Sequence, residues 1–167
     1  MAELTTRERL QPSLLDRLTD EAPWEDNESR EQRIITAARL RECVTRDISW
    51  LLNCTQHWSG EALTPYEHVN NSVLNYGIPD LAGTALSSIA PGELEQRIRE
   101  AILFYEPRLT GGTLTVQVGI EPERMDERSL TFRIHSQMWA QPMPLNLYLK
   151  TELDLDTGEF RVGQGLG

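Results

Sequence analysis

The residue types that most often carry out acid–base catalysis are sparse and isolated in this chain. The three histidines, His57, His68 and His135, each stand outside any catalytic motif. Histidine is the commonest general base because its pKa lies near neutrality, but a base also needs a nucleophile or an acid beside it. We therefore expect packing or surface roles for all three, with His135 on the outward side of a strand.

A cysteine and a histidine, Cys54 and His57, are spaced so that they could share one helix face. A metal site needs three or four ligands at suitable spacing, and the next candidates, Cys43 and His68, lie too far along the chain. On one helix the two cysteines would lie about 16 Å apart along its axis, too far for a disulfide. The sequence therefore predicts no metal, no cofactor and two free thiols, as in a reducing cytoplasm.

Carboxylates are abundant, with 26 acidic residues in the chain. Glycoside hydrolysis needs two carboxylates that flank the bond to be cleaved. Most acids here lie in hydrophilic runs, which are typical of solvated surfaces. The sequence also lacks zinc-protease, nucleophile-elbow and phosphate-loop motifs. The acids nearest to apolar residues are Glu61, Glu67, Asp80 and Glu106.

The charge of the chain excludes several kinds of partner. Its 167 residues carry a formal net charge of −10, which repels phosphate backbones and anionic lipid, so we expect no nucleic-acid partner. No apolar run approaches the roughly 20 residues that a membrane-spanning helix needs, so we expect no direct membrane insertion. Residues 1–5 lack the features of a secretory signal, which favours the cytoplasm.

Arginine dominates the basic residues: of 16, only Lys150 is a lysine. Arginine suits bidentate, partly buried ion pairs at interfaces. A GC-rich genome would give the same bias, so both explanations stay open.

The spacing of apolar residues changes along the chain from helical to strand-like. Steps of three and four predict helices at 10–18, 30–56 and 66–74, and one that follows Pro91-Gly92 and ends at Pro107. Alternation then predicts strands at 114–120, 130–134, 145–151 and 160–162. Helices first and strands last predict an α+β fold, with N-terminal helices packed on a mainly antiparallel C-terminal sheet.

The same patterns divide the chain into three parts. Residues 1–29 are expected to form a short helix and a polar linker, residues 30–163 a single α+β domain, and residues 164–167 a flexible tail. Within the domain, Gly77 and Pro79 predict a turn, which serves either to pack the middle helix or to dock a partner.

Four short segments stand out for their order along the chain. They are LQPSLLDRL at 10–18, RDISWLLN at 46–53, SVLNYGIPDL at 72–81 and EPRL at 106–109. Together they resemble the TssE family of type VI secretion baseplate subunits. That family is similar to the gene-25-like baseplate wedge proteins of contractile phage tails. The resemblance runs from about residue 10 to 162 and includes the strand-rich end.

The resemblance implies a structural protein in the cytoplasmic, membrane-docked baseplate. Its partners would be the baseplate proteins TssF, TssG and TssK and the sheath proteins TssB and TssC. The C-terminal strands of the family resemble part of the sheath fold, which implies that the subunit starts sheath polymerisation by strand exchange. No cofactor is implied.

The corner after the last helix is the first of two predicted partner-binding regions. Pro107 ends the helix, so Glu106 and Arg108 lie on a rigid corner and need not pair with each other. We expect one charge to fix the corner and the other to reach a neighbouring chain, although a plain helix stop with two solvated charges is the alternative. The predicted partner-binding residues are Glu106, Pro107, Arg108, Leu14, Leu15 and Leu18.

The three leucines form one apolar edge of the first segment. They could belong to the core or lie in a partner's groove, and the charged linker behind them fits docking on a partner.

Two other functions remain as alternatives. The family carries a lysozyme-like label, and a peptidoglycan-cleaving enzyme would use Glu106 as its acid. No Glu in the chain is followed nine residues later by Asp, the spacing of phage-type lysozymes. A stand-alone adaptor module is the other alternative. We predict a structural subunit that is not an enzyme.

Overall fold

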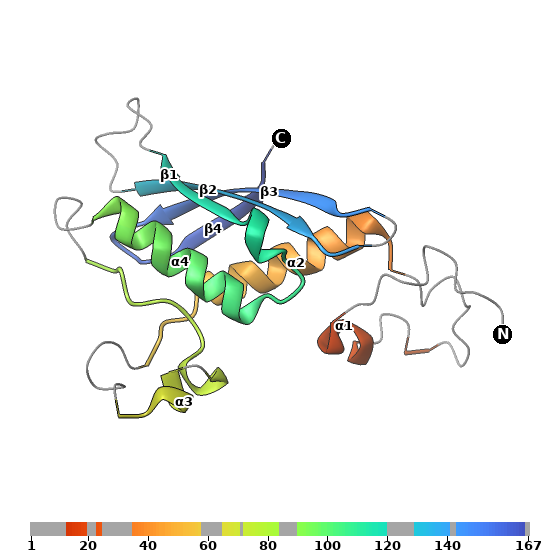
Figure 1. Ribbon diagram of the computed structural model, residues 1–167, viewed down its shortest axis with the longest axis horizontal. Helices are drawn as coiled ribbons and strands as arrows, with labels where there is room; N and C mark the ends of the chain where they lie inside the picture. Colours follow the sequence, from red (N-terminus) through yellow and green to blue (C-terminus); the bar gives the residue numbers. More distant parts are fainter. Residues whose placement is uncertain are drawn as a thin grey trace.

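Two long helices pack across one face of a four-stranded antiparallel sheet in the computed structural model (Figure 1). The structure describes residues 13–19, 23–24, 35–57, 65–70, 72–83, 90–119, 129–140 and 143–165. The helices are α1 (Leu14–Leu18), α2 (Ala37–Leu52), α3 (Glu67–Asn70) and α4 (Pro91–Tyr105), with 3-10 turns η3 (Val73–Asn75) and η5 (Gly111–Thr113). The strands are β1 (Thr115–Gly119), β2 (Ser129–Met138), β3 (Leu145–Asp154) and β4 (Phe160–Gln164). This confirms the predicted α+β class.

The longest helix, α2, is shorter than the sequence predicted. The Thr36 side chain caps its start by accepting from the backbone N–H of Arg39 at 3.1 Å. Asn53 ends it, because its side-chain amide donates to Ser49 O and to Phe160 O, both at 2.9 Å, and so ties the chain to β4. The predicted helix is therefore wrong over 35–36 and over 53–56. The predicted start at 30–34 lies outside the described residues.

The short helix α1 has a cap and no buried residue of its own. Ser13 is its N-cap, and its side chain accepts from the backbone N–H of Asp16 at 3.3 Å. None of its residues is buried.

The middle segment forms two separate turns where one helix over 66–74 was predicted. The structure has α3 and then η3, because the Ser72 side chain caps a new turn at Leu74 N. Val73 and Leu74, two apolar residues of the predicted helix, are 80% and 67% exposed and lie on the surface. The Tyr105 hydroxyl donates to the carbonyls of Ser72 and Asn75, at 2.9 and 3.0 Å, and so holds η3 against α4.

Helix α4 matches its prediction at both ends. Pro91 stands in its first turn, where a missing N–H breaks no helical hydrogen bond. The helix ends at Tyr105, and Glu106 adopts φ −120° and ψ 78°, because a residue before proline is kept out of the helical region. Its buried residues, spaced four apart, are Leu94, Ile98 and Ile102.

The sheet alternates as the period of two predicted. In β3, every second side chain is buried against the helices, and its neighbours face away. The registers are antiparallel throughout, with Phe132 opposite Thr151 and Ile134 opposite Leu149. The fully buried side chains that join sheet and helices include Val44, Ile48, Ile98, Ile102, Phe132, Ile134, Leu147 and Leu153.

The predicted turn at Gly77 is confirmed and has a steric reason. Gly77 has φ +125°, a region that side chains with a Cβ rarely adopt. A Cβ placed there would lie 2.1 Å from the carbonyl oxygen of Cys54. The close approach lets Ile78 N donate to Cys54 O at 2.9 Å, which joins this turn to the end of α2.

We expect Gly77→Ala to lower the free energy of unfolding by about 2–4 kcal/mol, through backbone strain and the clash with Cys54 O. Urea unfolding followed by circular dichroism measures this. Gly92→Ala is the matched control, because its added Cβ meets no atom within 4 Å in the first turn of α4. Similar losses in both variants would contradict the steric account.

Candidate functional site

The corner after α4 is built around a buried carboxylate. The Glu106 side chain is only 4% exposed. Arg108 donates from Nε to Glu106 Oε1 at 2.6 Å and from Nη2 to Oε2, and its backbone N–H donates to Oε1 at 3.1 Å. The guanidinium thus forms a two-pronged fork on the carboxylate, the strongest geometry that arginine offers.

This pairing differs from what the sequence suggested. Glu106 and Arg108 bind each other, because the extended backbone at Glu106 and the fixed φ of Pro107 bring side chains two residues apart together. The predicted contact of one charge with a neighbouring chain stays a prediction. Arg108 Nη1 is buried and has no hydrogen-bond partner within the described residues.

The corner is fixed to the rest of the domain at three places. Arg108 Nη2 reaches Asp47 Oδ2 on α2 at 2.5 Å, across 61 positions of sequence. The Arg108 carbonyl accepts from Trp139 N at 2.8 Å, and Thr110 N donates to Gln137 O at 2.7 Å. The corner therefore contacts both α2 and the end of β2, and cannot move independently of them.

The ion pairs continue from the corner to α1. Asp47 Oδ1 accepts from Arg46 Nε at 2.9 Å and from Nη2 at 2.7 Å. Arg46 Nη1 then donates to Asp16 Oδ1 on α1 at 2.7 Å. We call this alternating series of five side chains the charge chain, and its members are Glu106, Arg108, Asp47, Arg46 and Asp16.

Two pKa values reflect the charge chain. Burial alone would raise the pKa of Asp16, but hydrogen bonds from Arg46 and Ser13 outweigh it and lower the pKa from 3.8 to about 2. Burial would likewise lower the pKa of Arg108, but the hydrogen bonds to Glu106 and Asp47 raise it above its ordinary value. Asp16 and Arg108 therefore stay charged at neutral pH.

The leucine edge of α1 faces away from the domain. Leu14, Leu15 and Leu18 are 70%, 46% and 74% exposed, so none lies in the core. Charged and polar groups instead hold the helix to α2, through Asp16 and Arg46. Next to this contact, the guanidinium of Arg46 lies 4.9 Å from the ring centroid of Trp50, which is itself 51% exposed.

The other candidates for chemistry are not brought together. Asp80 accepts from Ala82 N at 2.9 Å and so stabilises its own turn. Glu61 and the side chain of Glu67 lie outside the described residues. Within the residues that the structure describes, no three His, Cys, Asp or Glu side chains could hold a metal ion.

The remaining histidines and cysteines are also dispersed. His57 and His68 are exposed, and His135 lies on the outward side of β2 as predicted. Cys43 and Cys54 are free thiols, with Cys54 just beyond the end of α2.

Sequence reasoning missed three members of the charge chain: Asp47, Arg46 and Asp16. Each belongs to a segment that was singled out, but no local pattern shows which charges meet across 30 or 61 positions.

In the described part of the chain, no helix is both long and apolar enough to cross a membrane.

We expect Arg108→Leu to destabilise the fold by about 3–5 kcal/mol, because it leaves the buried Glu106 carboxylate without its cation. Chemical unfolding measures the loss. Arg97→Leu is the control, because Arg97 pairs with Glu93 on the exposed surface of α4 and such pairs contribute less than about 1 kcal/mol. Adding Glu106→Gln to Arg108→Leu should recover part of the loss, and no recovery would argue against an uncompensated charge as its cause.

We expect the Asp16 carboxylate to titrate near pH 2 in the native chain. Because its pKa is lower in the folded state, the Asp16 pair stabilises the fold above about pH 4, and this stabilisation is lost as the pH falls toward 2. Carbon-13 NMR of the carboxyl group measures the midpoint directly. Arg46→Gln should move it up toward 3.8, and Arg97→Gln should leave it unchanged. An unchanged midpoint in Arg46→Gln would refute the ion pair.

Three comparisons with known proteins gave different results, and one of them shows the family. No curated protein sequence matches the chain. A solved structure of a provisionally assigned tail lysozyme from Geobacter sulfurreducens is similar to it, with 18% identity and a TM-score of 0.45, over 70% of this chain and 92% of the other. The family model for baseplate wedge protein gp25 matches residues 38–143, more than half of the chain, from α2 through the corner to the end of β2. The chain belongs to the family of baseplate wedge protein gp25.

Proposed function

We propose that this chain is a structural subunit of a phage-tail-like baseplate, which joins neighbouring proteins and transforms no substrate. The match of residues 38–143 to the baseplate wedge family carries the proposal. That range contains Asp47 together with the pair Glu106 and Arg108, which fix the corner between α4 and the sheet. A surface that is rigid before binding needs little ordering when a partner arrives, which suits an assembly subunit.

The leucine edge of α1 supports docking on a partner. Three exposed leucines on one short helix form an apolar surface that water solvates poorly. The charge chain holds α1 against α2, so the edge is presented at a defined position and not on a loose tail. An amphipathic helix laid in an apolar groove is a common way for such an edge to bind.

The finer proposal is a type VI secretion baseplate, on the strength of the TssE-like segments. The partners would be TssF, TssG and TssK in the wedge, and TssB and TssC in the sheath. The subunit would act in the cytoplasm, within a baseplate docked at the membrane.

The sheet offers a route to sheath initiation. Within the described residues, β1 and β4 each pair with one strand, so each leaves one edge without a partner. Unpaired N–H and C=O groups along an edge can add a strand from another chain. We propose that a sheath strand adds at one of these edges and starts polymerisation.

The geometry gives little support to Glu106 as a catalytic acid. A general acid must donate a proton and reach its substrate. Glu106 is 4% exposed, and both of its oxygens already accept from the Arg108 guanidinium, so neither oxygen is open to a substrate.

Purification of the tagged chain from its host should recover wedge and sheath proteins, identified by mass. Replacing Leu14, Leu15 and Leu18 by Ser should greatly reduce recovery of the wedge proteins, because it removes the apolar edge without touching the core. Val73→Ser with Leu74→Ser is the control, because these residues are similarly exposed but lie on η3. Full recovery with the α1 variant would refute the leucine edge. Absence of all wedge and sheath proteins from the native sample would favour a stand-alone adaptor.

The purified chain should not clear a suspension of peptidoglycan, measured as turbidity against a known lysozyme. Clearing that disappears in Glu106→Gln would establish the enzymatic alternative. The variant must first be shown to fold, because Glu106 also holds the corner.

A further inference from the structure

The side of the sheet turned away from α2 and α4 is open in the part of the chain that the structure describes (Figure 1). Two rows of side chains cross its middle, because residues paired across the strands lie side by side. One row is Thr115, His135 and Tyr148, and the other is Gln117, Arg133 and Lys150. Five of the six side chains are exposed and His135 is half-buried. We call this surface the outer face, and it consists of Thr115, Gln117, Arg133, His135, Tyr148 and Lys150.

The outer face concentrates positive charge in an acidic protein. Arg133 on β2 lies directly opposite Lys150 on β3, although the chain as a whole carries −10. Like charges opposite each other on neighbouring strands destabilise a sheet. The side chain of Arg133 makes no hydrogen bond or ion pair with any residue that the structure describes. The fold therefore gains no visible stability from placing a guanidinium there.

An aromatic platform lies beside the two cations. The rings of His135 and Tyr148 stack with their centroids 4.4 Å apart and their planes at 18°. The Nε2 atom of His135 is buried and has no hydrogen-bond partner among the described residues. Tyr148 remains 39% exposed, so the stack offers a flat apolar surface with a phenol at its rim.

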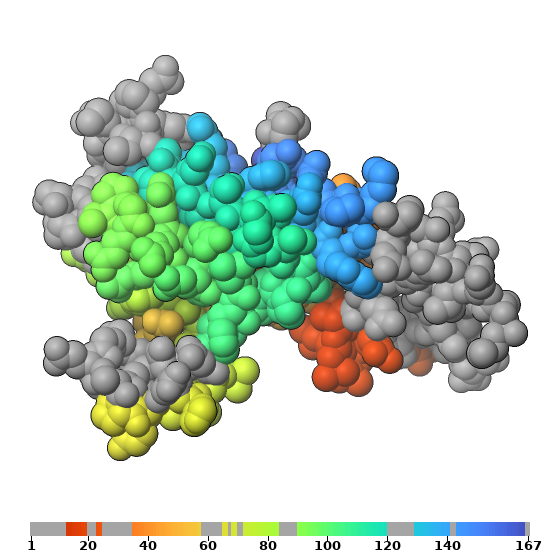
Figure 2. Space-filling model, viewed as in Figure 1, coloured from red at the N-terminus to blue at the C-terminus, as the bar shows by residue number. Residues whose placement is uncertain are grey.

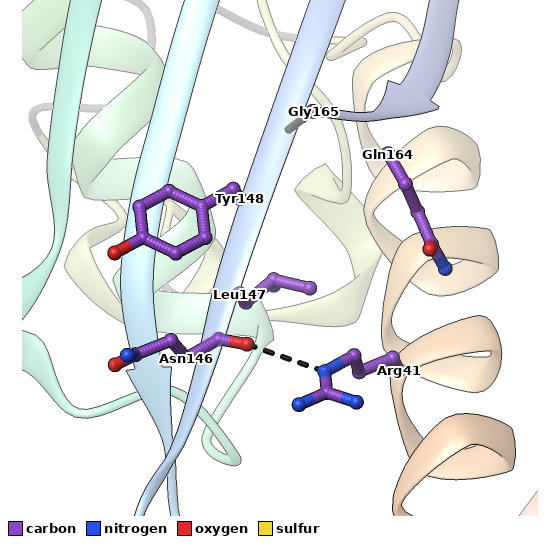
Figure 3. A pocket seen from close by; sticks show the side chains of 6 residues that line it. All are labelled: Arg41, Asn146, Leu147, Tyr148, Gln164 and Gly165. Carbon is purple, nitrogen blue, oxygen red and sulfur yellow. Dashed lines mark hydrogen bonds between the residues drawn. The ribbon is translucent and has the colours of Figure 1, made fainter. Parts of the chain in front are cut away.

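A pocket borders the outer face at Tyr148 and supplies a third cation (Figure 3). Arg41 reaches across from α2 and donates from Nε to the carbonyl of Asn146 at 3.3 Å. Its guanidinium forms no ion pair with a described residue. The pocket is lined by Arg41, Asn146, Leu147, Tyr148, Gln164 and Gly165.

The surroundings of the outer face leave room for a ligand that lies flat. Gly163 on β4 lies opposite Lys150, and Gly165, just beyond β4, donates from its backbone N–H to Tyr148 O. Because glycine has no side chain, neither row is blocked at this end. In the neighbouring row, Glu152 lies opposite Arg161, a pair of opposite charges. The excess of positive charge is therefore limited to the two middle rows and the pocket.

We propose that the outer face binds an acidic segment of a partner protein. Its carboxylates would pair with Arg133 and Lys150, and its side-chain stems would lie on the His135–Tyr148 stack. A further carboxylate would reach Arg41 in the pocket. Complementary charge fixes the position of the segment and speeds its association, with modest affinity because the contacts are exposed. This contact is separate from the leucine edge, the corner and the sheet edges, so it can fail while the proposed baseplate role holds.

A protein segment fits this surface better than a nucleic acid. Tight binding to nucleic acid requires a basic surface that neutralises many phosphates. Here two cations and one pocket arginine stand on a chain of net charge −10, which repels a long polyanion. A short run of Glu or Asp in a partner needs only these few contacts.

Amide NMR of the full chain tests the proposal, with hexaglutamate as the probe and hexaglutamine as its uncharged counterpart. At low salt, hexaglutamate should shift the amide signals of the outer face and of Arg41, and hexaglutamine should not. The dissociation constant should rise with salt, because exposed charges are screened. Arg133→Gln with Lys150→Gln should weaken binding by about tenfold, as expected for the loss of two exposed ion pairs.

The control for net charge is Arg39→Gln with Arg97→Gln, which removes two exposed arginines on the helices. It should bind hexaglutamate within about twofold of the native chain. Three results would overturn the proposal: no shifts on the outer face, equal weakening in both double variants, or tighter binding of oligothymidylate than of hexaglutamate at the same residues. Unchanged circular dichroism spectra will show that all variants fold.

Discussion

The buried carboxylate of Glu106 sets a condition that the surrounding structure must meet. A charge removed from water is destabilising unless a partner and hydrogen bonds replace its hydration, and Arg108 supplies both through its side chain and its backbone N–H. The guanidinium has further N–H donors, and its Nη2 also donates to Asp47 on α2. Each member of the charge chain holds the next in position. The end of α4, the middle of α2 and the short helix α1 are therefore fixed relative to one another.

The same requirement explains why polar contacts hold α1. An apolar contact would have buried the leucines, whereas the ion pair between Asp16 and Arg46 leaves Leu14, Leu15 and Leu18 exposed on the other side. Buried ion pairs seldom add much net stability, but in some proteins they select one arrangement over its alternatives. For the proposed baseplate subunit such discrimination would be useful, because a partner that contacts both the leucine edge and the corner would need them in one fixed geometry.

Regular periodicity made most of the fold predictable from the sequence. The four strands and α4 follow from alternation and from Pro91 and Pro107, which act locally. The ends of α2 were not predictable, because Asn53 stops the helix through a hydrogen bond to Phe160, 107 positions away. Val73 and Leu74 misled for a related reason: their spacing was helical, but the cap at Ser72 begins a new turn and points them to solvent. The corner was located from its residue types, and its partners Asp47 and Arg46 were missed because only the folded chain brings them together.

The two faces of the sheet separate the core from the surface that we propose binds a partner. The inner face is packed with side chains such as Phe132, Ile134 and Leu149, where a change of one methylene alters packing. The outer face makes few contacts within the described chain, so its residues can be chosen for a partner at little cost in stability. The corner lies between these extremes: Glu106 is buried like a core residue, and the charge chain links it to α1, which carries the exposed leucine edge. A substitution at Arg108 should therefore affect folding and assembly together, whereas one at Arg133 should affect only binding.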